Sequence, residues 1–466
     1  MKFNPSIFRT YDIRGLYPKD INSDFAYDLG RAYAAVFPDV KNVVVARDLR
    51  IGSPELMQGL VGGLLNAGIN VFEIIAEVPV SVMSFVICRD ALDGGIMVTA
   101  SHNPPQWNGF KLQLKNAYPV ISETFEKLRV VIEKGQFLKP RKKGELKRMD
   151  PREEYIEYLA GKIRLKRPLK IILDSGNAAC GYLPEKVFKK LGCEAETIYG
   201  DFDVNFPHHL PDPYEEKNLE DLKKRVVEAG ADAGFAYDGD GDRLGVIDKL
   251  GRIIKGDQYL IIFAREALKA KKGPVICEVR TSQAFLDDVK AHGGETYFSV
   301  AYHKAVLDKI IEKNAVFGGE TTGHLYFPLD YFLYDDAIFA SLKMADIITK
   351  YDNFTDYVDS LPKYATSPEI FINYPDETKK QAVNRFISIL KNKGYKFIDV
   401  DGARVVFENG WALARISNTS PMIKIRFEGR TEECLKKIEK EIIPLLAEAD
   451  IHLSAENYES LGLKKE

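Results

Sequence analysis

Two segments of this chain, far apart in the sequence, carry residue types that together could transfer a phosphoryl group. Residues 99–111 read T-A-S-H-N-P-P-Q-W-N-G-F-K and place a hydroxyl (Ser101), an imidazole (His102) and an ammonium group (Lys111) on a loop stiffened by two prolines. Residues 238–243 read D-G-D-G-D-R and supply three carboxylates within five residues. A nucleophilic serine and a cluster of hard oxygen ligands are the components of a metal-assisted phosphoryl transferase.

The acidic segment has the pattern of a metal site. Asp238, Asp240 and Asp242 alternate with glycines. Alternate residues of an extended chain point the same way, and the glycines let the backbone curl, so the three carboxylates can converge. A divalent cation removes their mutual repulsion, and ligands that are all oxygen favour Mg²⁺. We therefore predict that the three aspartates bind magnesium.

The acidic segment has three other possible interpretations. A calcium EF-hand loop requires Gly at its sixth position and Glu at its twelfth, where this chain has Arg243 and Lys249. The nucleophile loop D-x-D-G-T of haloacid-dehalogenase-type phosphatases ends in a hydroxyl residue, whereas the matching residue here is Asp242. An acidic surface turn without a metal is the third alternative.

Ser101 follows the apolar run 95–99, and α/β sheets place their chemistry at the ends of such strands. The surrounding residues do not form the G-x-S-x-G elbow of a hydrolase, and a turn or helix cap is the alternative role. Beside His102 and a magnesium site, Ser101 could instead carry a phosphoryl group of charge about −1.5 to −2, which Lys111 would partly neutralise. This hypothesis requires the Ser101 oxygen to be accessible and close to the aspartates.

Three further groups of polar residues could bind a sugar phosphate. Residues 318–324 read G-G-E-T-T-G-H, so Glu320 and the threonine hydroxyls could bind sugar hydroxyls. His324 and His303 could exchange protons, because the histidine pKa of about 6.5 suits acid–base catalysis at neutral pH; a structural role is the alternative.

A donor-rich loop lies near the end of the chain and consists of Arg415, Ser417, Asn418 and Thr419. Its guanidinium, hydroxyl and backbone N–H groups could bind a phosphate, with a polar hairpin turn as the alternative. Arg14 is a further, ambiguous candidate for anion binding.

Short apolar strands alternate with helical patterns and position these loops. The runs 43–46, 95–99, 170–173, 234–237, 274–279 and 315–317 are expected to be strands, which implies βαβ units and largely parallel, buried sheets. Residues 422–428 instead alternate apolar and charged side chains, which predicts a half-buried antiparallel strand after the run 411–416. A helix is expected over about 432–449, so the end of the chain should form an α+β domain.

Bulk properties exclude several classes of protein. The chain has 466 residues, 45% hydrophobic and 29% charged, which fits a globular protein of about three or four domains. A net charge of −3 argues against a nucleic-acid partner. No signal peptide or membrane span is evident. The five scattered cysteines predict neither a disulfide framework nor a zinc site, and fit a reducing cytoplasm.

Taken together, these motifs resemble the α-D-phosphohexomutase family, most closely its bacterial and archaeal phosphomannomutase/phosphoglucomutase group. The matching segments run in the family's order from Tyr11 to Thr419 and so cover nearly the whole chain. The resemblance implies an α/β fold with three similar α/β domains, whose sheets are mixed and largely parallel, plus a C-terminal α+β domain around a central cleft. We place these domains at residues 1–148 (phosphoserine loop), 149–251 (metal-binding loop), 252–364 (sugar-binding loop) and 365–466 (phosphate-binding loop).

The family's site residues can be carried onto this chain. The resemblance implies that Ser101 is a phosphoserine whose phosphoryl oxygen shares the magnesium ion with Asp238, Asp240 and Asp242. The other residues that it places in the site are His102, Lys111 and Arg243 beside the serine, His303 and His324 in proton transfer, and Tyr11, Arg14, Arg280, Glu320, Thr322, His324, Arg415, Ser417, Asn418 and Thr419 in substrate binding.

The departures from the family pattern are small. Thr322 replaces the usual serine of E-x-S-G-H, Tyr302 precedes His303 where glycine is frequent, and Arg280 stands where lysine is frequent. The segment R-I-S-N-T matches the hexose-phosphate branch better than the R-x-S-G-T pattern of phosphoglucosamine mutases.

The resemblance implies an isomerase that interconverts the 1- and 6-phosphates of mannose, glucose or both. It would use Mg²⁺, with hexose 1,6-bisphosphate as intermediate and activator. The alternatives are a phosphoglucosamine mutase, a magnesium-dependent sugar phosphatase with Asp238 as nucleophile, and a sugar-phosphate-binding protein without catalysis. We expect small-molecule hexose phosphates as partners, no nucleic acid and no membrane, and a cytoplasmic monomer or homodimer.

Overall fold

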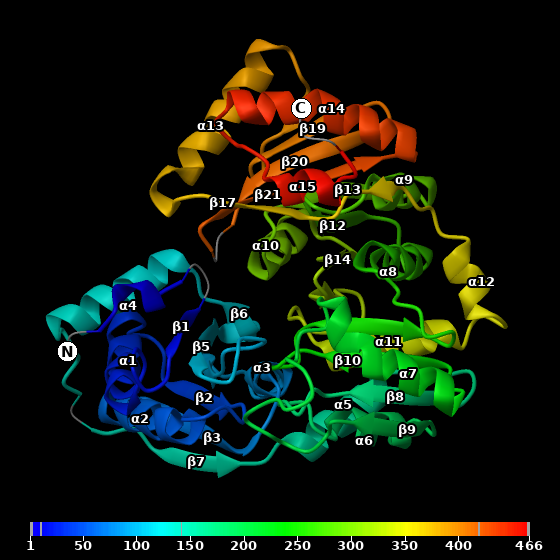
Figure 1. Cartoon of the computed structure of the whole chain (residues 1–466). Coiled ribbons are helices and arrows are strands. Elements are labelled where there is room, and N and C mark those ends of the chain that lie inside the picture. The colour runs from blue at the N-terminus through cyan, green and yellow to red at the C-terminus, as the bar shows by residue number, and fades with distance from the viewer. Residues whose placement is uncertain (1–2, 10–11, 141, 418–419, 464–466) are drawn as a thin grey trace. The chain divides into compact units, whose positions relative to one another are not determined.

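The computed structural model describes residues 3–9, 12–140, 142–417 and 420–463. The chain folds into two compact units (Figure 1). The first unit contains Met1–Lys255 and Thr322–Asp359, and the second contains Gly256–Thr321 and Ser360–Glu466.

The first unit begins with a mixed sheet that carries the serine loop. Its strands lie in the order β1 (Ile13–Leu16), β5 (Trp107–Leu114), β4 (Gly94–Val98), β2 (Asn42–Arg47), β3 (Asn70–Glu77) and β7 (Leu146–Met149), and β6 (Tyr118–Pro119) pairs with β5. Strands β4, β2, β3 and β7 are parallel to one another, whereas β5 is antiparallel to both β1 and β4. The five residues of β4 are buried, as a strand covered on both faces requires.

Helices cover both faces of this sheet (Figure 1). Helices α1 (Ser23–Val36), α2 (Ser53–Asn66) and α4 (Ser122–Lys134) share one apolar core with the sheet, and α3 (Val80–Arg89) packs on β2 and β4 from the other side. Asn22 caps α1 by accepting a hydrogen bond from the backbone N–H of Phe25. Two short 3₁₀ helices, η1 (Pro5–Ile7) and η2 (Lys115–Ala117), complete this part.

The second sheet of the first unit carries the acidic loop. Its order is β11 (Leu244–Asp248), β10 (Ala233–Tyr237), β8 (Lys170–Asp174) and β9 (Glu194–Ile198), with β8, β9 and β10 parallel and β11 antiparallel to β10. The remaining elements of the first unit are α5 (Arg152–Lys162), α6 (Leu183–Lys190), η3 (Glu216–Leu219), α7 (Glu220–Ala229), β15 (Leu325–Tyr326), α11 (Ala337–Ile348) and α12 (Phe354–Asp359). The Tyr237 and Ser341 hydroxyls, 2.9 Å apart, link α11 to β10.

The second unit combines a parallel sheet with an antiparallel one. In the parallel sheet, β12 (Pro274–Glu278) lies between β13 (Glu295–Ser299) and β14 (Phe317–Gly319), with helices α8 (Gly256–Ala270), α9 (Gln283–Ala291) and α10 (His303–Lys313). Strand β14 begins two residues later than the sequence suggests. Because the N–H of Ala315 bonds back to the carbonyl of Ile310, this residue completes the end of α10 and does not join the sheet.

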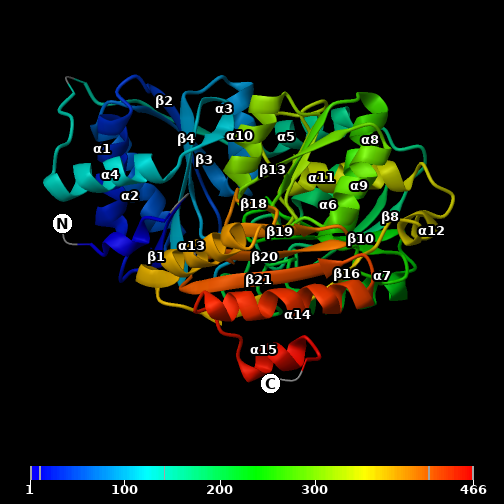
Figure 2. The same ribbon diagram turned by 90° about the horizontal axis from the view of Figure 1, so that it is seen from above.

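The end of the chain forms the expected α+β layer. The strands run in the order β16 (Ala365–Thr366), β21 (Met422–Gly429), β20 (Gly410–Ile416), β19 (Ala403–Phe407) and β18 (Phe397–Ile398), and β17 (Ile370–Asn373) also pairs with β21. Helices α13 (Asp376–Asn392) and α14 (Glu432–Glu448) cover one face of this antiparallel sheet, and α15 (Ala455–Ser460) follows (Figure 2). The apolar residues Ile423, Ile425 and Phe427 of β21 face this core, which confirms the alternation seen in the sequence.

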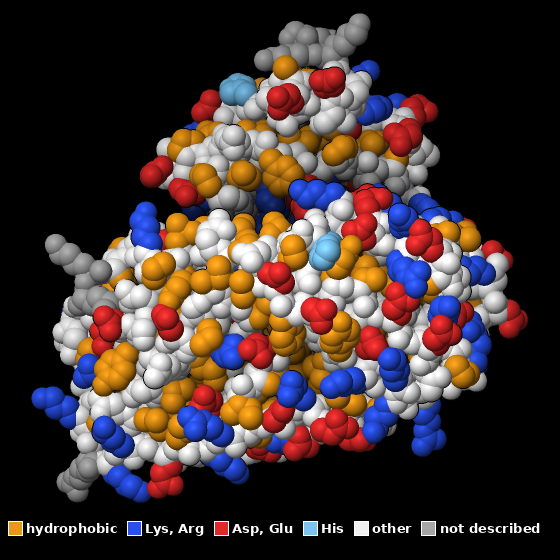
Figure 3. All heavy atoms as spheres, turned by 60° about the horizontal axis from the view of Figure 1, so that its bottom comes forward, with side chains coloured by type: hydrophobic (Ala, Val, Ile, Leu, Met, Phe, Trp, Pro, Cys, Tyr) orange, Lys and Arg blue, Asp and Glu red, His pale blue; other side chains and the backbone are white. Residues whose placement is uncertain are grey.

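The predicted fold class, α/β layers followed by an α+β layer, is confirmed. No helix within the described residues combines the length and apolar composition needed to cross a bilayer. Positive and negative side chains are interspersed over the face shown in Figure 3, in keeping with the small net charge.

Candidate active site

Ser101 lies directly beyond the end of β4, where its hydroxyl meets the acidic loop. Its Oγ donates a hydrogen bond to Oδ2 of Asp238 at 2.8 Å and lies 3.1 Å from Nδ1 of His102. Its backbone has φ +52°, and its N–H bonds to the Thr99 hydroxyl at 2.9 Å. A non-glycine residue in this left-handed region is uncommon, and such backbone strain gathers at functional sites.

The structure corrects one part of the hypothesis for Ser101. The expected proximity to the aspartates is present, but the residue is only 1% exposed, so its hydroxyl is not open to solvent. The groups bonded to that hydroxyl are the Asp238 carboxylate and the His102 ring, which belong to the same cluster. Phosphoryl transfer at Ser101 therefore requires the hydrogen bond to Asp238 to break.

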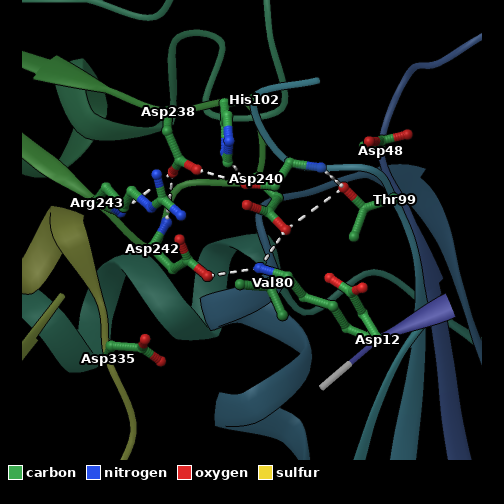
Figure 4. Close-up of polar contacts among 12 residues, drawn as sticks. Asp12, Asp48, Val80, Thr99, His102, Asp238, Asp240, Asp242, Arg243 and Asp335 are labelled. Atoms are coloured by element: carbon green, nitrogen blue, oxygen red, sulfur yellow. Dashed lines mark hydrogen bonds and ion pairs between the residues drawn. The ribbon is translucent and has the colours of Figure 1, made fainter. Parts of the chain in front are cut away.

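The three aspartates converge as the sequence predicts (Figure 4). They occupy the loop between β10 and β11, and one oxygen of each can be chosen so that all three lie within 4.8 Å of one another. Asp238 and Asp240 are 0% exposed and Asp242 is 3% exposed. Gly241 has φ +74°, so the bend that brings the carboxylates together needs a residue without a Cβ.

The charges around this loop are strongly coupled. Burial raises the pKa of Asp238 well above its ordinary value, and the neighbouring Asp242 and Asp240 raise it further. Burial acts on Asp242 in the same direction, but Lys111, His324 and Arg243 outweigh it and lower its pKa. Lys111 Nζ lies 2.7 Å from Asp240 Oδ2 and 2.6 Å from Asp242 Oδ2, and these carboxylates hold the ammonium pKa above its ordinary value despite burial.

The aspartate cluster fits a hard divalent cation. Among the described residues, Asp240 Oδ1 and Asp242 Oδ1 are buried oxygens without a hydrogen-bond partner. Buried carboxylate oxygens are costly unless they are bonded or coordinated. Three convergent oxygens of this kind match the ligand preference of Mg²⁺.

His324 belongs to the same unit and is oriented by two charged neighbours. Its Nδ1 lies 2.7 Å from Oδ2 of Asp335 and 3.7 Å from Oδ1 of Asp242, and its Nε2 accepts a hydrogen bond from Nε of Arg243 at 3.0 Å. Burial lowers the pKa of this histidine, but Asp242 and Asp335 outweigh it, so the pKa is raised. In the arrangement shown, the proton is on Nδ1 and the Nε2 lone pair faces Arg243.

His102 belongs to the serine loop, and Arg14 bonds to it through Asn103. Burial and the nearby cations of Arg243, Arg14 and Lys111 lower the pKa of His102 well below its ordinary value, so its ring is neutral at neutral pH. Arg14 bonds to Asn103 Oδ1 at 2.7 Å and to Asp12 Oδ2 at 2.6 Å. Thr322 lies in the first unit and is partly exposed, and Tyr11 lies outside the described residues.

The second unit contains Glu320 and Arg280, two of the predicted substrate-binding residues. Glu320 follows β14 and is 3% exposed, and its Oε1 lies 3.8 Å from Arg280 NH2. Arg280 Nε is 3.0 Å from Glu278 Oε2, and Arg280 outweighs burial and lowers the pKa of Glu278. His303 is the first residue of α10, also in this unit.

The predicted phosphate-binding loop lies at the end of β20. Arg415 is 4% exposed and donates from Nε to Asp401 Oδ2 at 2.8 Å, and the Ser417 and Ser420 hydroxyls are 2.8 Å apart. Asn418 and Thr419 lie outside the described residues. Arg415 is directly opposite Lys424 of β21, so the two cations share a face of the sheet.

Asp335 and Lys424 were missed as site candidates. Burial, with help from Arg280 and Arg415, lowers the pKa of Lys424, which shows how crowded with positive charge this face is. The alternation of β21 placed Lys424 on its polar face, and that signal could have identified it. Asp335 stands in the segment Y-D-D with no recognisable motif, so nothing in the sequence linked it to His324.

Four family models match consecutive segments of the chain. They describe the alpha/beta/alpha domains I, II and III of phosphoglucomutase/phosphomannomutase, over residues 5–139, 153–251 and 255–364, and the C-terminal domain of the same family over residues 369–445. The chain belongs to the phosphoglucomutase/phosphomannomutase family. The resemblance inferred from the serine and aspartate motifs is thereby confirmed.

Relatives of this family match over almost their full length. A phosphoglucomutase of Neisseria gonorrhoeae is 34% identical over 452 residues, covering 96% of this chain and 98% of the relative. A phosphomannomutase/phosphoglucomutase of Pseudomonas syringae is 33% identical over 438 residues, covering 93% of each chain. The crystal structure of a phosphoglucomutase/phosphomannomutase family protein from Burkholderia thailandensis superposes with a TM-score of 0.91 at 33% identity, covering 96% of this chain and 98% of that one.

Proposed function

We propose that this protein is a phosphohexomutase that interconverts hexose 1-phosphate and hexose 6-phosphate, with Ser101 as the carrier of the phosphoryl group. The single observation that carries the proposal is the 2.8 Å hydrogen bond between Ser101 Oγ and Asp238, within a cluster of three aspartates. The names of the relatives, phosphoglucomutase and phosphomannomutase/phosphoglucomutase, support glucose and mannose phosphates as substrates.

Phosphorylated Ser101 would be the covalent enzyme intermediate, and the phosphoryl group that it loses in the first transfer is restored in the second. The O–P bond of phosphorylated Ser101 breaks while the free 1- or 6-hydroxyl of a hexose monophosphate forms a new O–P bond. The product is a hexose 1,6-bisphosphate, and the other phosphoryl group of this sugar then returns to Ser101. Reversal of the sugar between the two transfers exchanges the phosphate position without net hydrolysis.

Electrostatic stabilisation dominates phosphoryl transfer, and several residues of the first unit would supply it. Asp238, Asp240 and Asp242 would hold Mg²⁺, whose charge would stabilise the transferring phosphoryl oxygens. Lys111 and Arg243 would add positive charge at the same site. His102, which is neutral at this site, would orient the Ser101 hydroxyl through the 3.1 Å contact.

We propose His324 as the group that exchanges the proton of the sugar hydroxyl. Asp335 holds its Nδ1–H and leaves Nε2 as the basic atom. Because Arg243 donates to Nε2, this atom becomes available only when the arginine turns away, for example towards a phosphate. His303 is the second candidate for this role.

The second unit would recognise the ends of the sugar that do not react. Glu320 would accept hydrogen bonds from sugar hydroxyls, and Arg415 and Ser417 would bind the distal phosphate. The remaining proposed substrate-binding residues are Tyr11, Arg14, Arg280, Thr322, Asn418 and Thr419. The five cysteines carry free thiols, which supports action in a reducing compartment such as the cytoplasm.

The experiment is an assay of phosphate-position exchange combined with intact-mass analysis. Wild-type protein, given Mg²⁺ and catalytic glucose 1,6-bisphosphate, should convert glucose 1-phosphate and mannose 1-phosphate to the 6-phosphates and gain one phosphoryl group. Ser101→Ala should keep its fold and lose both properties. Ser84→Ala removes another buried serine hydroxyl, which bonds to Gln113, and is the matched control.

Each alternative function predicts a different outcome. Release of inorganic phosphate without phosphoserine would indicate a phosphatase with Asp238 as nucleophile. Preference for glucosamine 1-phosphate would indicate a phosphoglucosamine mutase. Sugar-phosphate binding without exchange would indicate a binding protein, and full exchange by Ser101→Ala would refute the proposal.

A further inference from the structure

Arg50 is a buried cation whose guanidinium binds the backbone of the serine loop. It lies between β2 and α2 and is 1% exposed. Its NH2 group donates to the carbonyls of Ser101 and, at 2.6 Å, Asn103. Its NH1 group donates to the carbonyls of Pro104 at 2.9 Å and Trp107 at 3.1 Å. One side chain therefore bonds four carbonyls over seven residues of the loop.

The loop supplies some donors of its own, since the Trp107 N–H bonds to the Pro104 carbonyl at 3.0 Å, and Arg50 adds donors to this and to three other carbonyls. Pro104 and Pro105 have no N–H, so they cannot donate to neighbouring carbonyls. A buried carbonyl without a hydrogen bond costs about 1–3 kcal/mol. A guanidinium carries five donors in a fixed planar fork, so it can bond several carbonyls at once, which a lysine ammonium cannot do with the same geometry.

The guanidinium itself is held in place by its surroundings. Its Nε lies 3.3 Å from Asp48 Oδ2, and the Asp48 Oδ1 atom accepts hydrogen bonds from the Ser53 hydroxyl at 2.8 Å and from the Arg50 N–H at 3.0 Å. The centroid of the Phe206 ring lies 5.2 Å from the guanidinium carbon of Arg50. Phe206 belongs to the segment between β9 and η3. Figure 4 shows Asp48 beside Thr99, whose hydroxyl bonds to the Ser101 N–H.

The Ser101 carbonyl is also in contact with the acidic loop. A Cβ placed on Gly239 would approach this oxygen to 2.0 Å, so the backbone of the aspartate loop rests against it. The Arg50 guanidinium bonds to the same oxygen. The relative position of the serine hydroxyl and the three aspartates thus depends on a carbonyl held by Arg50.

We propose that Arg50 is a positioning residue for phosphoryl transfer, which fixes the serine loop so that Ser101 Oγ meets the aspartate cluster. This inference rests on the proposed function. The Arg50 guanidinium bonds to backbone carbonyls, whereas the Ser101 hydroxyl contacts Asp238 and His102, so Arg50 would act through the loop backbone. A misplacement of about 1 Å at a reacting atom can reduce the rate about a hundredfold.

The test compares Arg50→Lys with a matched variant, Arg404→Lys. Arg404 is also 1% exposed and donates to two backbone carbonyls, those of Val279 (2.6 Å) and Thr281 (2.7 Å), but it lies in the second unit. Both variants replace a buried guanidinium with an ammonium group, so both proteins should unfold at a lower temperature than wild type. Arg404→Lys measures the effect of that general loss of stability.

Two activity measurements separate positioning from stability. The first is the division of the defect between kcat and KM with glucose 1-phosphate as substrate. The second is the lifetime of the phosphorylated enzyme, prepared with glucose 1,6-bisphosphate and followed by intact mass. For Arg50→Lys we expect kcat to fall about a hundredfold with little change in KM, and a changed phosphoserine lifetime. For Arg404→Lys we expect a wild-type phosphoserine lifetime.

If Arg50→Lys has the stability loss of the control but a wild-type kcat and phosphoserine lifetime, the inference is wrong. If Arg50→Lys does not fold, Phe206→Leu weakens the packing of the guanidinium without removing its hydrogen bonds and should lower kcat to a smaller extent. An unchanged kcat in that variant would also overturn the inference. Wild-type protein without any exchange activity would refute the proposed function itself, and this inference with it.

Discussion

Asp336 should make the first unit less stable as the pH rises from acidic to neutral. It is the N-cap of α11, where Oδ1 accepts a hydrogen bond from the Phe339 N–H at 3.0 Å. Its Oδ2 accepts from the Tyr155 hydroxyl at 2.8 Å and the Tyr331 hydroxyl at 2.7 Å. Burial nevertheless raises its pKa from 3.8 to about 6, because these hydrogen bonds only partly offset the loss of solvation.

The sign and size of the effect follow from proton linkage. Between the unfolded pKa of 3.8 and the folded pKa of about 6, the folded state binds the proton more tightly, so stability decreases as the pH rises and is constant above that range. A shift of this size corresponds to about 3 kcal/mol in total. About 2 kcal/mol of it falls between pH of about 4.5 and about 7.5. Asp336→Asn does not titrate and should lack this term.

The assay is urea unfolding of wild type and Asp336→Asn across that pH range. The chain has two tryptophans, Trp107 in the first unit and Trp411 in the second, so a Trp411→Phe background lets fluorescence report the first unit alone. The stability of Asp336→Asn relative to the parent should increase by about 2 kcal/mol from the acidic to the neutral end. Taking the difference cancels titrations common to both proteins.

Tyr155→Phe is a control that keeps the Asp336 carboxyl group and changes its pKa. It removes a hydrogen bond that lowers the pKa of Asp336, so the pH dependence of the first unit should extend to higher pH. A stability difference between parent and Asp336→Asn that does not change between acidic and neutral pH would refute the reasoning.

Two further substitutions test other charged pairs. Asp335→Asn should reduce kcat roughly tenfold or more and lower the pKa of His324, since it removes the carboxylate bonded to Nδ1; a pH–rate profile measures both. His209→Gln should reduce stability more at acidic than at alkaline pH, because Asp174 outweighs burial and raises the pKa of His209 above its ordinary value of 6.5. That stabilisation is fully present below pH 6.5 and is lost as the pH rises through the folded pKa; equal losses at both ends of the range would contradict this assignment.

The strands and the loops that follow them could be predicted because their signals are local. Strand β10 is a run of five buried residues, and the D-G repeat that follows it is a turn pattern whose three carboxylates favour a metal site. Strand β21 reveals its exposed and buried faces by simple alternation. In each case the residues that decide the structure are adjacent in the sequence.

The partners of the site residues could not be predicted because they depend on packing between distant segments. Asp335 reaches His324 across a loop with no regular period, and Arg50 reaches carbonyls 51 to 57 positions later in the chain. The low exposure of Ser101 has the same origin. The Ser101 hydroxyl bonds to Asp238, 137 positions later in the chain, and the Gly239 backbone approaches the Ser101 carbonyl, and no pattern around these residues encodes either contact.

The geometry of the serine loop explains why the acidic loop contains glycine between its aspartates. The glycines were predicted from the need to curl the backbone, and φ of +74° at Gly241 confirms that need. Gly239 has no positive φ, and its requirement is different: a side chain there would collide with the Ser101 carbonyl. That carbonyl is the same atom that Arg50 bonds. The absence of a side chain at one position and the presence of a guanidinium at another therefore serve one purpose, which is to hold the hydroxyl of Ser101 against the carboxylate of Asp238.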